Sequence, residues 1–379
     1  MKYILTLLFE LITHRQKPLK RLPNYVLRFL SHDSRLRPED FGGQVSRGLK
    51  YLLFTSLFLI GCGTTKETIP EYIWPSPPEQ PRFKLVNIIK GEDYFTKSKS
   101  DALLSILAGE SKENALVRPF GVTADATGTI YVTDTSLKNV VIFDNQIKKM
   151  RSIGDKGQQK LHTPIGVIVT PENNIIVSDS FLKRIFVFDT DGNVIRTFGS
   201  ENQFGSPTGI AYEPKLRRLY IVDTNKHYVI VIDDEGNQLF TFGERGGEDG
   251  QFNFPTNITI AYEKIYIIDT FNGRIQIFDL DGKFLSKFGQ LGNTPGHFAR
   301  PKGIAIDSDK NIYVTDAAFD NFQIFNEKGE TLMFIGNSGI GAGEFHLPAG
   351  IFIDQNNLLY VVDQLNARIQ IFKYIIINK

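Results

Sequence analysis

Residues 301–336 read PKGIAIDSDKNIYVTDAAFDNFQIFNEKGETLMFIG. Apolar and polar residues alternate in four short runs within this stretch: Gly303–Asp307, Asn311–Asp316, Asn321–Phe325 and Thr331–Ile335. Runs of this length with a period of two, separated by Asp, Asn and Gly, predict antiparallel strands rather than a helix. We therefore expect the stretch to form one four-stranded sheet.

The same pattern returns six times along the chain. An Asp closes each second run, and successive copies are 44 to 47 residues apart: Asp134, Asp179, Asp223, Asp269, Asp316 and Asp363. A Pro opens each repeat, and two residues later stand Gly121, Gly166, Gly209, Asn257, Gly303 and Gly350. Four strands in a repeat of this length are typical of a β-propeller blade, so the sequence predicts an all-β, six-bladed propeller.

Three further positions recur with the repeat. The Gly or Asn after each opening Pro suits either a positive φ or a close approach of two backbones. Gly192, Gly236, Gly282 and Gly329 mark the hairpins between third and fourth strands. An apolar residue precedes each Pro by three positions, and we expect these residues to fill the space between neighbouring blades: Leu116, Leu161, Phe204, Phe252, Phe298 and Phe345.

The phrase P-x-G-I-A-I-D…N-I-Y-V-T-D…N-x-R-I-Q-I-F resembles the NHL repeat, and the resemblance covers residues 116–373. It implies a six-bladed propeller that usually acts as a binding module. NHL domains occur in many unrelated proteins, so the fold alone does not assign a function.

The propeller is expected to span residues 83–379 and to be closed by an N-terminal strand. The sixth repeat ends with three strands, whereas Ala102–Gly109 (ALLSILAG) resembles the fourth strand at Lys283–Gly289. We therefore expect Ala102–Leu107 to complete the sixth blade and remove an exposed sheet edge. Phe83–Ile89 alternates like a strand and would either extend this sheet or cover it.

Residues 49–62 have the pattern of a secretion signal, with basic residues, a short apolar run and Leu59-Ile60-Gly61-Cys62 at the end. This ending resembles the bacterial lipobox, which implies that Cys62 becomes the lipidated N-terminus; Gly63 after it fits outer-membrane sorting. The alternative is a buried free Cys in an ordinary strand. We expect a lipid-anchored protein of a bacterial cell envelope, facing the periplasm or the cell surface.

Residues 1–48 form an N-terminal extension that does not fit this signal. Met occurs only at positions 1, 150 and 333. We therefore hypothesise that translation starts at a non-AUG codon for Val45 or Leu49. Residues 63–82 are rich in Pro, which predicts an extended linker, and the single Trp, Trp74, either docks on the propeller or is a partly exposed linker residue.

The predicted channel wall has no catalytic group. Counting along the first strands, the residues facing the channel are Thr123, Ile168, Ala211, Thr259, Ala305 and Phe352. At the far strand ends stand Asp125, Glu213, Asp307 and Asp354, which either ring a cation or form hairpin turns. The six His have no zinc-ligand spacing, so we expect neither a metal site nor a cofactor.

The repeated Asp is expected to be structural, because a catalytic residue would occur once. It would cap a loop and, in three blades, pair with Arg184, Arg274 or Arg368, five residues later.

The remaining candidate surface is the face carrying the connectors and the loops between second and third strands. Its blade-specific residues, which solvated surface would explain equally well, are Arg118, Phe120, His227, Tyr228, Asn272, Arg274, Lys302 and Phe319.

The expected function is a binding or scaffolding module for an envelope protein or a small ligand. The alternative is a metal-dependent lyase or lactonase of the six-bladed type. Residues 51–379 hold 33 Lys/Arg and 38 Asp/Glu, which argues against a nucleic-acid partner.

Overall fold

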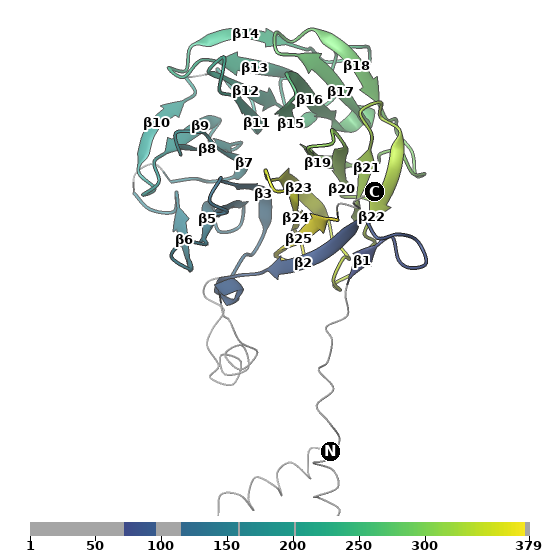
Figure 1. The fold of residues 1–379 in the computed structure, drawn as a ribbon. Coiled ribbons are helices and arrows are strands. Elements are labelled where there is room, and N and C mark those ends of the chain that lie inside the picture. Colours follow the sequence, from purple (N-terminus) through teal and green to yellow (C-terminus); the bar gives the residue numbers. More distant parts are fainter. Residues whose placement is uncertain (1–71, 96–114, 158–159, 201, 376–379) are drawn as a thin grey trace, which may run out of the picture. The chain divides into compact units, whose positions relative to one another are not determined.

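The computed structural model describes residues 72–95, 115–157, 160–200 and 202–375. These residues form six antiparallel sheets arranged around a centre, as Figure 1 shows. Five sheets have four strands, and the sheet that holds the C-terminal strand has five. The predicted six-bladed propeller is confirmed.

The first three blades lie between residues 119 and 242. Blade 1 contains β3 (Pro119–Ala124), β4 (Ile130–Asp134), β5 (Asn139–Asp144) and β6 (Lys149–Ile153). Blade 2 contains β7 (Pro164–Val169), β8 (Ile175–Asp179), β9 (Arg184–Phe188) and β10 (Val194–Phe198). Blade 3 contains β11 (Pro207–Glu213), β12 (Arg218–Asp223), β13 (Tyr228–Ile232) and β14 (Gln238–Phe242).

The other three blades complete the ring. Blade 4 contains β15 (Pro255–Ala261), β16 (Lys264–Asp269), the 3₁₀ turn η3 (Thr270–Asn272), β17 (Arg274–Asp279) and β18 (Phe284–Phe288). Blade 5 contains β19 (Pro301–Ile306), β20 (Ile312–Asp316), β21 (Asn321–Phe325) and β22 (Thr331–Ile335). Blade 6 contains β23 (Pro348–Ile353), β24 (Leu358–Asp363) and β25 (Arg368–Tyr374), together with β2 (Phe83–Ile89) and β1 (Ile73–Trp74).

The hydrophobic core is divided into six clusters, one at each junction between neighbouring blades. In blade 1, Val132 faces blade 6 and the adjacent Tyr131 faces blade 2. Successive strand residues point to opposite faces, and both faces of a blade are covered. This explains why a second strand such as β4 is buried along its whole length while fourth strands such as β18 are largely exposed.

The apolar residues predicted to separate the blades do so. Each one lies in a different junction cluster and is at most 3% exposed: Leu116, Leu161, Phe204, Phe252, Phe298 and Phe345. The hairpin glycines also have the expected positive φ, from 79° at Gly329 to 91° at Gly236.

Five of the six first strands have a Gly near their start, which is explained by close approach and not by φ. A Cβ on Gly121 would lie 2.4 Å from the carbonyl oxygen of Ile165 in the next blade. Beside it, the Thr133 hydroxyl donates to that same oxygen at 2.8 Å and accepts the Gly121 N–H at 2.7 Å. Innermost strands of neighbouring blades therefore come together too closely for an ordinary side chain.

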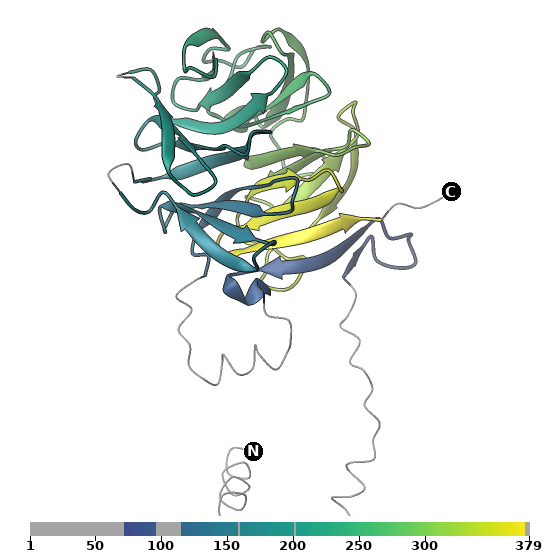
Figure 2. The ribbon, with the colours of Figure 1, turned by 60° about the vertical axis from the view of Figure 1, so that its left-hand side comes forward.

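The strand that closes the ring is β2, which corrects the prediction for Ala102–Leu107. β2 pairs with β25 from Phe83↔Tyr374 to Ile89↔Ile369, so the outer position of blade 6 is occupied. Both views show it beside β25 (Figures 1 and 2). Phe83 enters the blade 5–6 cluster and Ile89 the blade 6–1 cluster, which explains the choice of this segment. Residues 102–107 lie outside the described residues.

Part of the expected linker also belongs to the propeller. Ile73 and Trp74 form β1 and pair with Lys84 and Phe83, with cis peptide bonds at Trp74–Pro75 and Pro77–Pro78 between the strands. The Trp74 ring packs edge-on against Phe372, with centroids 5.5 Å apart. Residues 72–82 are therefore a docked hairpin and not an extended tether.

The predicted secretion signal and lipid anchor fall on residues that the structure does not describe. Cys62 and the rest of residues 1–71 are outside the described residues. Within the part of the chain that is described, no helix has the length and apolar character needed to cross a membrane.

Candidate functional site: a basic cavity at one mouth of the channel

The repeated Asp residues fasten the connectors to the loops between second and third strands. In blade 1, Asp134 accepts the N–H groups of Val117 and Arg118 from the connector, at 2.8 and 2.9 Å. Its other oxygen accepts the N–H groups of Ser136 and Leu137 in the loop, both at 3.0 Å. All six Asp side chains belong to completely buried residues, so each blade uses one carboxylate to order this face.

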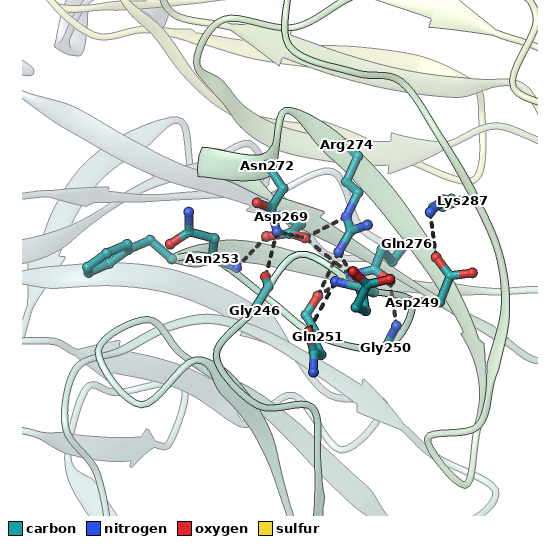
Figure 3. A network of polar contacts seen from close by, with 12 residues as sticks. Gly246, Asp249, Gly250, Gln251, Asn253, Asp269, Asn272, Arg274, Gln276 and Lys287 are labelled. Atoms are coloured by element: carbon teal, nitrogen blue, oxygen red, sulfur yellow. Dashed lines mark hydrogen bonds and ion pairs between the residues drawn. The ribbon is translucent and has the colours of Figure 1, made fainter.

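Blade 4 adds an ionic clamp to this arrangement (Figure 3). Arg274 Nε donates to Asp269 at 2.8 Å, and its guanidinium also donates to the carbonyl oxygens of Glu248 and Gln251. Gln276 accepts the Gly250 N–H and donates to the carbonyl oxygen of Gln251, so both side chains bind the connector. Arg274 is 6% exposed, so a buried guanidinium and a buried carboxylate satisfy each other.

Two predicted binding residues, Asn272 and Arg274, are therefore parts of this clamp. Asn272 donates to the carbonyl oxygen of Gly246 and to Asp269. Blade 6 repeats both interactions with Asn366 and Arg368 around Asp363. That repetition is visible in the sequence and distinguishes the pair from a single-copy site.

The expected third ion pair does not form. Arg184 of blade 2 is exposed, and among the described residues its guanidinium has no ion pair with Asp179. Asp179 instead accepts connector N–H groups from His162 and Thr163.

Three other predicted binding residues lie away from the cavity described below. His227 is buried, its Nδ1 accepts the Phe254 N–H at 3.1 Å, and burial lowers the pKa of its imidazole. Tyr228 opens β13 beneath Lys226, whose Nζ is 5.8 Å from the ring centroid. Phe319 is half-buried in the loop between β20 and β21.

The central channel contains a cavity of about 430 Å³ whose uncharged wall mixes polar and apolar groups. All six residues predicted to face it line it: Thr123, Ile168, Ala211, Thr259, Ala305 and Phe352. No lining residue is a Lys, Arg, His, Cys, Asp or Glu. The one phenol, that of Tyr212, donates to Asp234, and its pKa is raised to about 12, chiefly by burial.

A second cavity, of about 480 Å³, lies at the connector end of the channel. Its wall includes Arg118, Arg300 and Lys302 but no Asp or Glu, and we call it the basic cavity. The remaining lining residues come from blades 1, 2, 5 and 6: Phe120, Thr135, Ser136, Thr163, Ile165, Ala317, Leu347, Pro348, Ala349 and Gln364. Of the eight predicted binding residues, Arg118, Phe120 and Lys302 thus meet in one place.

Lys302 is the most constrained of the three cations. Its Nζ lies 5.9 Å from the centroid of the Phe120 ring, although blade 6 separates the blades that carry them. Blade 6 has only Ala349 at the equivalent position, which leaves room for this reach. Burial, followed by the nearby Arg300 charge, lowers the pKa of the Lys302 ammonium. Arg118 and Arg300 are exposed to solvent and Lys302 is half-buried, and in the described part of the chain none of the three cations forms an ion pair.

Arg300 is the lining cation that sequence reasoning missed. It stands immediately before Pro301, as Arg118 stands before Pro119, and the other four blades have Thr163, Ser206, Phe254 and Leu347 there. A comparison of this position across the repeats would have found the pair of arginines.

The carboxylates at the opposite end of the channel form turns. Asp307 accepts the N–H groups of Asp309 and Asn311, and the Tyr313 hydroxyl donates to it at 2.8 Å. Asp125 and Asp354 have the same pattern with Tyr131 and Tyr360, and Glu213 accepts the Lys215 N–H. Within the described residues no three His, Cys, Asp or Glu side chains come together as a metal site would require.

Comparison with protein families supports the fold. A family model described as a 6-bladed beta-propeller matches residues 247–318 and 308–375. Protein brain tumor of Drosophila melanogaster is 35% identical over 60 residues, which are 16% of this chain. The match spans only 6% of that protein's length.

Solved structures share the fold at low identity. A streptogramin B lyase structure has a TM-score of 0.53 at 13% identity, covering 69% of this chain and 94% of the other. Virginiamycin B lyase from Staphylococcus aureus has a TM-score of 0.52 at 15% identity, with 77% and 100% covered. A protein of unknown function from Bacteroides thetaiotaomicron has a TM-score of 0.56 at 14% identity, with 69% and 70% covered. At these identities the likeness concerns the fold alone.

Proposed function

We propose that this protein is an NHL-type binding module of the bacterial cell envelope, anchored through a lipid on Cys62, and that it captures a negatively charged ligand in the basic cavity. The observation that supports the proposal is the convergence of Arg118, Arg300 and Lys302 on one cavity whose wall has no acidic residue. A cavity of this size matches ligand sites in other proteins, which range over roughly 300–1,000 Å³.

The physical reason is the cost of leaving the Lys302 charge, the one of the three that is largely withdrawn from water, without a partner. A cation withdrawn from water is stabilised by an anion or by hydrogen-bond acceptors. The Lys302 ammonium lies near the face of the Phe120 ring and near the positive charge of Arg300, and neither of them neutralises it. An oxyanion placed here would supply the missing countercharge through charge-assisted hydrogen bonds.

The binding proposal is tested with inorganic phosphate as the probe, using residues 63–379 with the signal removed and low ionic strength. We expect phosphate to raise Tm, because a ligand that binds only the folded state at 100 times its Kd stabilises by about 2.7 kcal/mol. The variant Lys302→Met with Arg300→Gln should lose this shift. Lys283→Met, which removes an exposed Lys on the outer hairpin of blade 4, should keep it. Equal shifts in all three proteins would refute the binding site.

The anchor is tested separately in a bacterial host. Wild-type protein should incorporate labelled palmitate and partition into the detergent phase, whereas Cys62→Ser should do neither. Palmitate incorporation by the Cys62→Ser variant would refute an anchor at this residue.

A further inference from the structure

The basic cavity and the channel are adjoining compartments. Phe120 and Ile165 line both of them, one from the first strand of blade 1 and the other from that of blade 2. Four residues of β3 follow Phe120, and at a rise of about 3.3 Å each they continue the channel wall for roughly 13 Å from this boundary. A ligand held at the basic cavity can therefore extend along an uncharged wall on which Ile168, Ala211 and Phe352 lie among polar groups.

The molecule is electrically polar along this path. Three cations line the connector end, the wall between has no charged residue, and Asp125, Asp307 and Asp354 stand at the opposite strand ends. The acidic side chains at that end are unfavourable neighbours for an anion. An anionic group is therefore favoured at one end only, and the middle, which has no charged residue, favours an uncharged body.

We propose that the ligand is an amphiphile with one anionic head, a carboxylate or a phosphate, at Arg118, Arg300 and Lys302 and an apolar chain in the central channel. This inference rests on the proposed function and specifies its ligand class. The head supplies a countercharge for the cations, and the chain displaces water from the apolar part of the wall, which includes Ile168, Ala305 and Phe352. Neither compartment alone would select for both parts.

The test measures the affinity of the soluble domain for a series of carboxylates by calorimetry, below their micelle-forming concentrations. Acetate, hexanoate and decanoate are the probes, with decanedioate and decyltrimethylammonium as controls. Burial of each methylene contributes about 0.8 kcal/mol, so Kd should fall about fourfold per methylene that enters the channel. Decanedioate should bind more weakly than decanoate, because its second carboxylate meets the apolar wall and the acidic end. Decyltrimethylammonium should not bind.

Two variants separate the head from the tail. Lys302→Met should weaken the binding of decanoate and the binding of phosphate together. Thr259→Phe, which fills the channel, should reduce decanoate to the affinity of acetate while leaving the phosphate-induced rise in Tm unchanged; that rise also shows whether the variant is folded. The chain-length series on wild-type protein does not depend on either variant.

The outcomes distinguish the two proposals. If acetate and decanoate bind equally, or if decyltrimethylammonium binds as well as decanoate, the amphiphilic ligand is excluded while the anion site stands. If neither phosphate nor any carboxylate binds, the proposed function fails with it.

Discussion

Arg274 and Arg184 occupy the same position in two blades but have different surroundings, which makes them a matched pair for testing the ionic clamp. Arg274→Met keeps an unbranched side chain and removes the guanidinium. The structure shows three donated bonds that would be lost, to Asp269 at 2.8 Å, to the Glu248 carbonyl at 2.8 Å and to the Gln251 carbonyl at 2.9 Å. Arg184→Met removes a guanidinium that is exposed and has no ion pair with any residue the structure describes.

The expected magnitude follows from what remains after the change. Breaking a buried ion pair costs about 3–5 kcal/mol when the remaining charge is left without partners. Asp269 keeps the Asn253 N–H at 2.6 Å, the Asn272 amide at 2.8 Å and the Gln276 amide at 3.2 Å. We therefore expect the lower end, about 3 kcal/mol, for Arg274→Met. Arg184→Met should change stability by less than about 0.5 kcal/mol, as surface substitutions usually do.

Thermal unfolding followed by far-ultraviolet circular dichroism measures this difference. A domain of roughly 150–250 residues loses about 2–4 °C in Tm per kcal/mol, and at the low end of that range Arg274→Met should lower Tm by about 6 °C. Arg184→Met should lie within about 1 °C of wild type by the same conversion. If the two variants shift Tm equally, the clamp does not stabilise the blade and the reasoning is wrong.

Three further predictions concern the packing and the pH dependence of the propeller. Gly121→Ala should destabilise by about 1–3 kcal/mol because the new methyl group meets backbone of the next blade, whereas Gly247→Ala, in open space, should be neutral or slightly stabilising in urea unfolding. Phe298→Ala should lower the free energy of unfolding by about 3–5 kcal/mol because it leaves a cavity at the blade 4–5 junction, whereas Phe334→Ala, at a half-exposed position, should change it little. Equal urea midpoints for the two variants would contradict the junction role. Burial lowers the pKa of His227, so its contribution to stability is full above pH 6.5 and is lost as the pH falls, when the unfolded chain takes up the proton first. The Tm of the His227→Asn variant should therefore fall less than that of wild type between pH 7 and pH 5. Parallel profiles of Tm against pH would exclude this role.

Local pattern was sufficient to predict the blades. Each strand is specified by alternation within a few residues, and each connector residue such as Phe298 is specified by its distance from a Pro and an Asp in the same repeat. Each blade packs against one similar blade on either side. A position that recurs in the sequence therefore also recurs in the packing. The channel wall could be predicted for the same reason, by counting along the first strand.

The closing strand could not be chosen in this way. Phe83–Ile89 alternates like a strand, and Ala102–Leu107 resembles the fourth strand of a blade, so both were candidates. The choice depends on which apolar residues fit the two junctions beside blade 6, where Phe83 and Ile89 are at most 2% exposed. That fit is a property of the closed ring and has no local signature.

By itself the sequence determined the number of blades, the strands within them, the residues between them and the uncharged channel, because all of these repeat with one period. Only the tertiary structure decided that Arg118, Arg300 and Lys302 line one cavity, while Asn272 and Arg274 of the same predicted face are bound to Asp269 in a clamp. The physical reason is ring closure, which brings Phe120 of the first blade close to Lys302 of the fifth. Blade 6, which lies between them, has only Ala349 at the equivalent position. The cavity therefore depends on residues of three separate repeats.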